Sequence, residues 1–354
     1  MTKFNLKRRP EITCAVILHV LLFPSISHAT GFLIYNQHAA ANALAIAYTA
    51  QVDNPSAVFY NPAAINQLSG TQASFGTVII IPRTKFTSDS TGETSRMKDH
   101  TYVLPNFYLT HKLNEKLSFG IGSFSPFGLS TDWPDDWEGN HLSTYARLRT
   151  FYVNPVVSYQ VHPKLSLAVG FNLIYSDLRF KRALKINPLP LNLGQADLDM
   201  DDIAYGFNLA LSYQITDRIK LGLSYRSSID VEYDGDANFR APRLLKPLLP
   251  EGGVSLDIEL PPIVATGIAA AITDKLTLEF DLIWVGFSTY DELYADFDQR
   301  INPLLKSQFA PIQRDYKDVL DIAMSARYQA SESLSLLCGF LFDRSTVPEE
   351  NVDP

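Results

Sequence analysis

The sequence predicts an all-β fold, a transmembrane antiparallel β-barrel of about eleven strands with an N-terminal plug in its lumen. Three observations predict this class: a repeated unit of strand, polar turn and strand, a clean alternation of apolar and polar residues, and a succession of short turns and long loops. After residue 29 no stretch is apolar enough for a membrane helix. No linker or change in composition divides this part of the chain, so we expect one domain.

Residues 1–29 are predicted to be a signal peptide. Four basic residues precede the apolar run ITCAVILHVLLF, and the small residues Ser27 and Ala29 follow on either side of His28. A membrane anchor is the alternative, but twelve apolar residues fall short of the ~20 that span a bilayer. Removal of this segment takes Cys14 with it, so Cys338 remains alone and no internal disulfide is expected.

The charge of the predicted mature chain argues against nucleic acid as a partner. Taking the four basic residues and Glu11 of the signal from totals of 30 and 38 leaves 26 basic and 37 acidic side chains, a net charge of −11. No serine hydrolase motif, cysteine pair or metal-spaced histidine motif is visible, so we expect no enzyme, cofactor or metal site. An outer-membrane lipase stays open, and the acidic run DLDMDD from Asp197 is interpreted as a solvated loop rather than a calcium site.

One unit recurs five times along the chain, as a polar turn between two strands. The copies are KLNEKLSFGIG from Lys112, QVHPKLSLAVG from Gln160, QITDRIKLGLS from Gln214, AITDKLTLEFD from Ala271 and QASESLSLLCG from Gln329. Counting strands from Thr71 gives eleven, and the last is Leu334 to Phe342. Bacterial single-chain barrels have even strand numbers, so we expect the sequence to lack about three C-terminal strands.

Alternation with period two identifies these segments as strands. Leu167, Val169 and Phe171 share one face of their strand, and in a later strand Leu278, Phe280 and Leu282 lie opposite Glu279 and Asp281. A soluble sandwich would turn the apolar face inward, whereas a membrane barrel turns it to lipid and keeps the acids in a polar lumen. The alternation alone is compatible with both the soluble sandwich and the membrane barrel.

Loop and strand lengths favour the barrel. Every second connection is a tight turn, and the strands are long enough for the ~9–11 tilted residues that cross a membrane. The long loops are expected at 82–100, 132–143, 183–202, 237–254 and 291–317.

Residues 30–70 lie between the signal and the first strand, and residues 71–354 form the predicted barrel. The first of these segments is rich in Ala and turn residues and too apolar to float free, so it needs a place to be buried. A barrel lumen offers that place, where the segment would act as a plug. A periplasmic arm is the alternative.

The stretch DNPSAVFYNPAAI from Asp53 resembles the plug signature of the FadL/TodX family of outer-membrane transporters of hydrophobic compounds. The resemblance continues through LPN from Leu104, SPFGLSTDW from Ser125 and GFNLIY from Gly170. It implies a 14-stranded barrel closed by the plug, with a sideways exit where the third strand kinks inward. It also implies a monomer in the outer membrane of a Gram-negative bacterium, in contact with lipid and lipopolysaccharide.

The kink matches Ser125, Pro126, Phe127 and Gly128, and the chemistry of these residues points the same way. Pro126 cannot donate to a sheet and Gly128 weakens one, so a break in pairing is expected. By the resemblance, Asn61 of the Asn61-Pro62 pair is the plug residue that hydrogen-bonds the kink, and Ser125 is its partner. A plain turn at Asn61 and an ordinary strand end at Pro126 are the alternatives.

The implied function is passive uptake of hydrophobic compounds. The apolar loop segments LKINPLPLNL from Leu184 and PRLLKPLLP from Pro242 are expected to form an external landing groove, or else to pack against each other.

Arg182 continues the lumen face of its strand beyond Phe180 and matches an arginine that contacts the substrate carboxylate in relatives, so we expect Arg182, Phe180 and Phe127 to bind substrate. This favours long-chain fatty acids, with aromatic hydrocarbons, alkanes or a general porin for polar solutes as alternatives. Pairing of Arg182 with Asp199 or Asp201 is the other interpretation of that residue.

Overall fold

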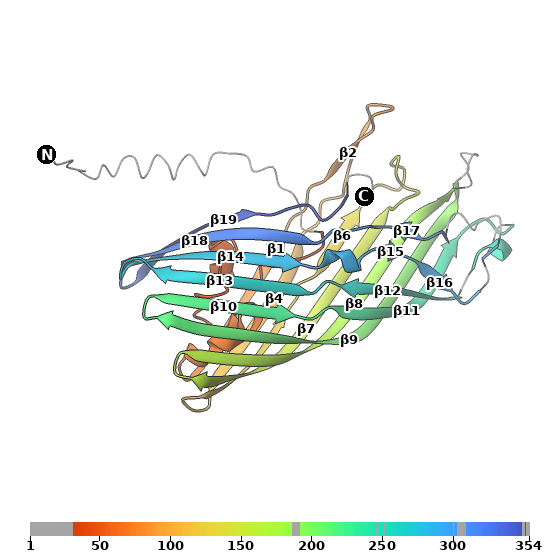
Figure 1. Ribbon diagram of the computed structural model, residues 1–354. Helices are drawn as coiled ribbons and strands as arrows, with labels where there is room; N and C mark the ends of the chain where they lie inside the picture. The colour runs from red at the N-terminus through yellow and green to blue at the C-terminus, as the bar shows by residue number, and fades with distance from the viewer. Residues whose placement is uncertain are drawn as a thin grey trace, which may run out of the picture.

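Eleven strands pair one after another to form a tall curved wall, as the computed structural model shows (Figure 1). The structure describes residues 31–185, 192–244, 246–250, 252–299, 301–302, 309–348 and 351. The predicted signal peptide, residues 1–29, lies outside the described residues. In pairing order the strands are β1 (Thr71–Ile80), β4 (Tyr102–Lys112), β5 (Leu117–Phe124), β7 (Tyr145–His162), β8 (Leu165–Lys185), β9 (Asn192–Thr216), β10 (Ile219–Arg226), β13 (Ile263–Ala271), β14 (Leu276–Val285), β18 (Val319–Ser331) and β19 (Leu334–Phe342).

All pairings between these neighbours are antiparallel. Further strands extend the wall or form small hairpins: β6 (Gly128–Asp132), β11 (Ile229–Arg240), β12 (Gly252–Leu260), β16 (Ala295–Phe297), β2 (Lys85–Thr87) with β3 (Thr94–Arg96), and β15 (Glu292–Leu293) with β17 (Ile312–Gln313). Short 3-10 turns follow at η2 (Lys246–Leu248) and η3 (Phe287–Thr289). The five polar turns of the sequence repeat join β4 to β5, β7 to β8, β9 to β10, β13 to β14 and β18 to β19, so the predicted architecture is confirmed.

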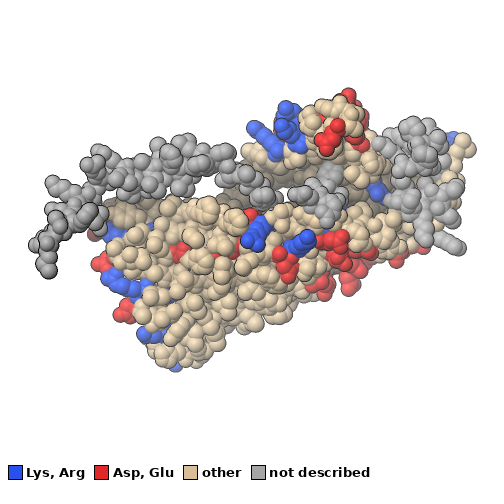
Figure 2. Space-filling model, turned by 45° about the horizontal axis from the view of Figure 1, so that its top comes forward, with Lys and Arg blue, Asp and Glu red and all other residues tan. Residues whose placement is uncertain are grey.

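The two faces of the wall differ in polarity as the alternation predicts. On the outer face, Val169, Phe171 and Phe280 are exposed although they are large and apolar. On the inner face of β14, Glu279 and Asp281 are buried. Figure 2 shows the apolar outer face as a broad tan area with charged side chains on either side of it. Among the described residues, no helix is long and apolar enough to cross a bilayer.

The predicted long loop 183–202 is wrong over most of its length and 237–254 at its two ends, because strands continue into them. β8 reaches Lys185 and β9 begins at Asn192, while β11 ends at Arg240 and β12 begins at Gly252. The acidic run from Asp197 belongs to β9, in which Leu198 and Met200 point inward while Asp197, Asp199 and Asp201 point outward. The reason is that period two persists beyond the apolar band, with acids instead of apolar residues on the outer face.

The N-terminal segment, residues 31–70, lies against the inner face of the wall. It holds the short helices α2 (Ala39–Ala43) and α3 (Ala57–Tyr60) and the 3-10 helix η1 (Pro62–Gln67). Its contacts reach strands from β4 round to β19, and in Figure 1 it is drawn in red and orange within the curl of the sheet. Apolar side chains of this segment, among them Leu44, Val58, Tyr60 and Ile65, are almost completely buried. The apolar side chains of this segment are therefore buried against the strands of the wall, as its composition predicts.

Candidate functional site

The third strand of the wall is interrupted between Phe124 and Gly128. Up to Phe124, β5 pairs with β4 on one side and with β7 on the other. From Gly128 onward, β6 pairs with β7, and no register to β4 is found among the described residues. The outer half of β4 is thus paired with β1 alone. Pro126 has no N–H to give to a ladder, so the break lies where its chemistry predicts it.

The backbone groups at the break are satisfied by other partners. Ile34 N donates to Pro126 O at 2.6 Å, and Gly128 N donates to Phe32 O at 2.9 Å. Thr150 Oγ1 donates to Phe127 O at 2.7 Å and accepts from Phe127 N at 3.2 Å. Because an unpaired backbone group facing lipid costs several kcal/mol, the N-terminal segment and Thr150 together make the break tolerable.

Gln37 completes this set of bonds with both ends of its amide. Its Nε2 donates to Ser125 O at 2.8 Å, and its Oε1 accepts from Ser125 N at 3.3 Å. The predicted hydrogen bond between Asn61 and Ser125 is therefore wrong. Sequence reasoning missed Gln37 because no motif marks it, although it is one of few polar residues in an apolar stretch.

Asn61 is occupied elsewhere because it caps a helix. Its Oδ1 accepts from Ala63 N at 3.2 Å, and Pro62 takes the first helical position of η1, where a missing N–H costs nothing. Its Nδ2 donates to Thr49 O at 2.9 Å and to Leu211 O on β9 at 3.1 Å. Asn61 and Pro62 thus fix the N-terminal segment to a different part of the wall from the break.

A cavity of about 430 Å³ lies beside the break, between the outer half of β4 and β6. Three of the predicted gating and binding residues, Ser125, Phe127 and Gly128, line it, together with Ile34 of the N-terminal segment. The other lining residues are Ile80, Pro82, Thr101, Tyr102, Val103, Leu104, Leu129, Ser130, Arg147, Leu148, Arg149, Thr150 and Phe151.

The lining of the cavity includes residues from both faces of the wall. Val103, Leu129 and Phe151 are exposed on the outer face, whereas Phe127 is 1% exposed and its ring lies 5.9 Å from that of Phe32. Tyr102 Oη donates to Ser130 Oγ at 2.7 Å across the gap. Most of the residues that line the cavity are apolar.

Arg182 and Phe180 lie in a second, smaller cavity of about 80 Å³ near the outer end of the wall. Arg182 is the one charged residue among the described residues that line it, and its guanidinium carbon lies 5.6 Å from the centre of the Phe309 ring. Leu178, Leu198 and Phe297 are among the apolar residues around it. The predicted site residues therefore divide between two cavities that share no lining residue.

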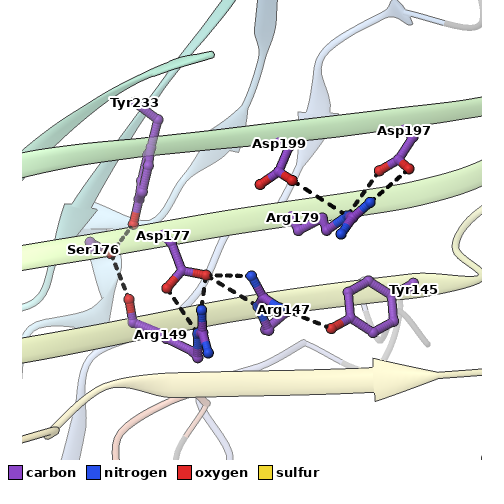
Figure 3. A network of polar contacts seen from close by, with 9 residues as sticks. All are labelled: Tyr145, Arg147, Arg149, Ser176, Asp177, Arg179, Asp197, Asp199 and Tyr233. Carbon is purple, nitrogen blue, oxygen red and sulfur yellow. Dashed lines mark hydrogen bonds and ion pairs between the residues drawn. The ribbon is translucent and has the colours of Figure 1, made fainter. Parts of the chain in front are cut away.

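Figure 3 shows a polar network on β7, β8 and β9, most of it on their outer face. Arg179 donates to Asp197 at 3.0 Å and lies 3.7 Å from Asp199, and Arg147 and Arg149 both bond Asp177. Asp199 is thus engaged on the outer face of β9, whereas Arg182 of β8 lines the cavity on the inner face. The pairing of Arg182 with Asp199 is for that reason wrong.

Two inner-face acids of β14 hold the N-terminal segment in place. Asp281 accepts from Tyr48 N and Thr49 N, both at 2.9 Å. Glu279 accepts from Ala50 N at 2.6 Å and from Gln51 N at 3.0 Å. An ion pair from Arg327 of β18 to Asp53 adds a further tie. The alternation pattern placed both acids on the inner face but could not name their partners.

Comparisons with known proteins agree with this geometry. The family described as "Outer membrane protein transport protein (OMPP1/FadL/TodX)" matches residues 20–354. The long-chain fatty acid transport protein of Escherichia coli O6:H1 is 23% identical, over 95% of this chain and 82% of that protein. Outer membrane protein P1 of Haemophilus influenzae is 23% identical, over 83% of this chain and 72% of that protein.

Solved structures share the fold. A Pseudomonas aeruginosa FadL homologue superposes with a TM-score of 0.79 at 19% identity, over 92% of this chain and 83% of that chain. The Pseudomonas putida toluene transporter TodX superposes with a TM-score of 0.67 at 17% identity, over 90% and 87% of the two chains. The family match spans the wall and the N-terminal segment alike, and the chain belongs to the OMPP1/FadL/TodX family of outer-membrane transport proteins.

Proposed function

We propose that this outer-membrane protein takes up long-chain fatty acids passively and releases them sideways, through the break in the third strand, into the bilayer. The observation that carries the proposal is the cavity at the break, which opens toward lipid and is lined mainly by apolar side chains. Hydrocarbon partitions into lipid with a gain of ~0.8 kcal/mol per CH₂, so transfer in this direction requires no external energy.

The N-terminal segment supports a sideways route by its position. It contacts strands round the wall, and its backbone is bonded to Glu279 and Asp281. As a plug it would block direct passage to the periplasm, which disfavours a general porin. The family is one of transporters rather than enzymes, and we propose no catalytic activity.

Arg182 favours a carboxylated substrate over a hydrocarbon. It places a guanidinium in an otherwise apolar cavity, a combination that suits a fatty acid headgroup and the start of its chain. Uptake of aromatic hydrocarbons is the second candidate, because the toluene transporter TodX shares the fold. External capture at residues 184–193 and 242–250 stays a prediction. Leu244 is almost fully exposed there, while residues 186–191 and 245 lie outside the described residues.

Uptake by a bacterial host that lacks its own fatty acid transporter tests the proposal. Cells that express the protein should take up oleate faster than toluene. The variant Gly128→Phe should reduce uptake of oleate severalfold, because a side chain added at Gly128 meets Ile34 at 3.1 Å and extends into the cavity. Val169→Phe, which adds the same ring to the lipid face of β8, is the matched control and should leave uptake unchanged.

Two results would contradict the proposal. Unchanged oleate uptake by a membrane-assembled Gly128→Phe protein would exclude the sideways route. Swelling of protein-containing liposomes in sugar solutions would identify an open porin instead.

A further inference from the structure

Arg226, the last residue of β10, is a buried cation inside the wall. It is 5% exposed, and no ion pair to a carboxylate is found for it in the described part of the chain. Its guanidinium donates to Asn172 Oδ1 and, at 3.5 Å, to Phe59 O of the N-terminal segment. A buried charge without a counter-ion is costly, so its retention calls for a reason.

Aromatic rings surround this guanidinium and offset part of that cost. The guanidinium carbon lies 5.2 Å from the ring centre of Phe59, 5.2 Å from that of Phe124 and 5.9 Å from that of Tyr152. Contacts with aromatic faces stabilise a cation. The rings carry no net negative charge, however, so they do not neutralise the positive charge of Arg226.

Two polar atoms beside Arg226 are also without a hydrogen-bond partner among the described residues. They are Tyr152 Oη and Asn172 Nδ2, and both side chains are fully buried. Asn172 is oriented by Arg226, because its Oδ1 accepts from the guanidinium and its amino group must then point elsewhere. Buried polar atoms left unpaired are uncommon and each is costly. All three groups can donate a hydrogen bond, which is the chemistry that binds an anion.

The three groups lie close to the cavity at the break. The ring of Tyr152 is 6.5 Å from that of Phe127, which lines the cavity, and 5.7 Å from that of Phe124. One layer of aromatic side chains therefore separates Arg226 from the sideways exit. An amphipathic molecule with its head at Arg226 would have its tail in apolar surroundings.

We propose that Arg226, Tyr152 and Asn172 form an inner carboxylate-binding site that selects fatty acids over neutral molecules of the same length. The inference rests on the proposed function and deepens it, adding an inner charge to that of Arg182 in the outer cavity. A guanidinium binds a carboxylate with two parallel hydrogen bonds. Because Phe59 and Phe124 cover the guanidinium, a headgroup reaches it when one of these rings changes rotamer.

The test compares binding of oleate and of oleyl alcohol, which has the same chain without the carboxylate, to the purified full-length protein. Arg226→Gln should weaken oleate binding about tenfold or more, with a much smaller effect on the alcohol. Tyr152→Phe removes only a hydroxyl group that has no partner, so the fold should persist while oleate binding weakens about threefold to tenfold.

Arg327→Gln is the matched control, because Arg327 is also an inner-face arginine that contacts the N-terminal segment. A loss caused only by loosening of that segment should affect both ligands equally, as Arg327→Gln is expected to do. Equal losses for both ligands in Arg226→Gln would overturn the site. Unchanged oleate binding in Tyr152→Phe would also overturn it, whether or not Arg226→Gln folds.

The outcome separates this inference from the proposed function. If the wild-type protein binds both ligands and Arg226→Gln lowers the affinity for both equally, the proposed uptake function is retained and the inner carboxylate site is excluded. If the wild-type protein binds neither ligand, the proposed function itself fails.

Discussion

Gln37 is the residue that connects the N-terminal segment most directly to the break in the third strand. Its amide bonds both the N–H and the C=O of Ser125, two groups that have lost their partners on β4. The break itself could be predicted from the sequence, because Pro126 and Gly128 act through their own backbones. Gln37 could not, since its partner is 88 residues away and any polar side chain in that stretch fits the local pattern equally well.

Gln37→Ala should destabilise the break. It leaves two buried backbone groups of Ser125 unpaired, at about 1–3 kcal/mol each, so the amides near the break should exchange with solvent faster. Hydrogen exchange of the purified protein measures this, with Asn36→Ala as control because Asn36 is exposed. Equal exchange at Ser125 and Gly128 in the Gln37→Ala and wild-type proteins would show that Gln37 does not hold the break.

Asp197 lies on the part of β9 that extends beyond the apolar band. We expect it to make the stability of the outer end of the wall depend on pH. Burial acts to raise the pKa of Asp197, but hydrogen bonds from Arg179 and Lys181 outweigh it, and the pKa lies below the ordinary value of 3.8. A carboxyl group whose pKa is lowered by folding stabilises the fold above its unfolded pKa. That contribution is lost as the pH falls through the folded pKa.

Thermal unfolding between pH 3 and pH 7 checks this expectation. Asp197→Asn should be less stable than the wild-type protein at pH 7, and the difference should shrink as the pH falls below about 4. Asp199→Asn is the control, since Asp199 is 54% exposed and 3.7 Å from Arg179, and it should have little effect at any pH. A difference that does not change with pH would rule out the ion pair as its source.

At the scale of elements, the N-terminal segment and β14 meet in an arrangement that only the folded chain reveals. Alternation in the sequence predicts that Glu279 and Asp281 face inward, because they interrupt a run of apolar residues with period two. It carries no information on what they contact. The four successive amides from Tyr48 to Gln51 become their partners only after the segment has been placed inside the wall.

The polarity of the outer face explains why strand residues within 183–202 and 237–254 were predicted to be loops. The strands β8, β9, β11 and β12 continue outward past the apolar band, where acids replace apolar residues on the outer face. Because apolar residues are expected on the outer face of a strand in such a barrel, a stretch with acids on that face resembles a loop in the sequence. The inner face keeps its apolar pattern there, and the alternation of Leu198 and Met200 with aspartates was the available signal.

Replacing Glu279 and Asp281 together by alanine should release the segment from β14. Four buried N–H groups would lose their acceptors, so the amides from Tyr48 to Gln51 should lose protection from exchange, and small polar solutes should pass the membrane more readily. Conductance in planar bilayers measures the second effect. Asp257→Ala removes an exposed acid on β12 and should change neither quantity. Conductance as low in the double variant as in the wild-type protein would mean that these acids do not keep the segment in place.

At the scale of the whole molecule, the proposed route for an oily solute uses three features of the wall. They are an outer cavity with one arginine, an aromatic interior around Arg226 and an apolar opening beside β6. The N-terminal segment lies against the inner face beside that opening and, by its contacts, holds the break in shape. Burial of hydrocarbon alone suffices to move a fatty acid along such a path, since each CH₂ contributes ~0.8 kcal/mol.

Photocrosslinking with a fatty acid that carries a diazirine near the end of its chain tests the sideways route most directly. In intact outer membranes, we expect the label to attach to residues at the break, such as Phe127, Leu129 and Phe151, and Gly128→Phe to abolish this labelling. Labelling of the N-terminal segment and of the short turns after β7 and β9, unchanged by Gly128→Phe, would show instead that the solute passes straight through and would exclude the sideways route.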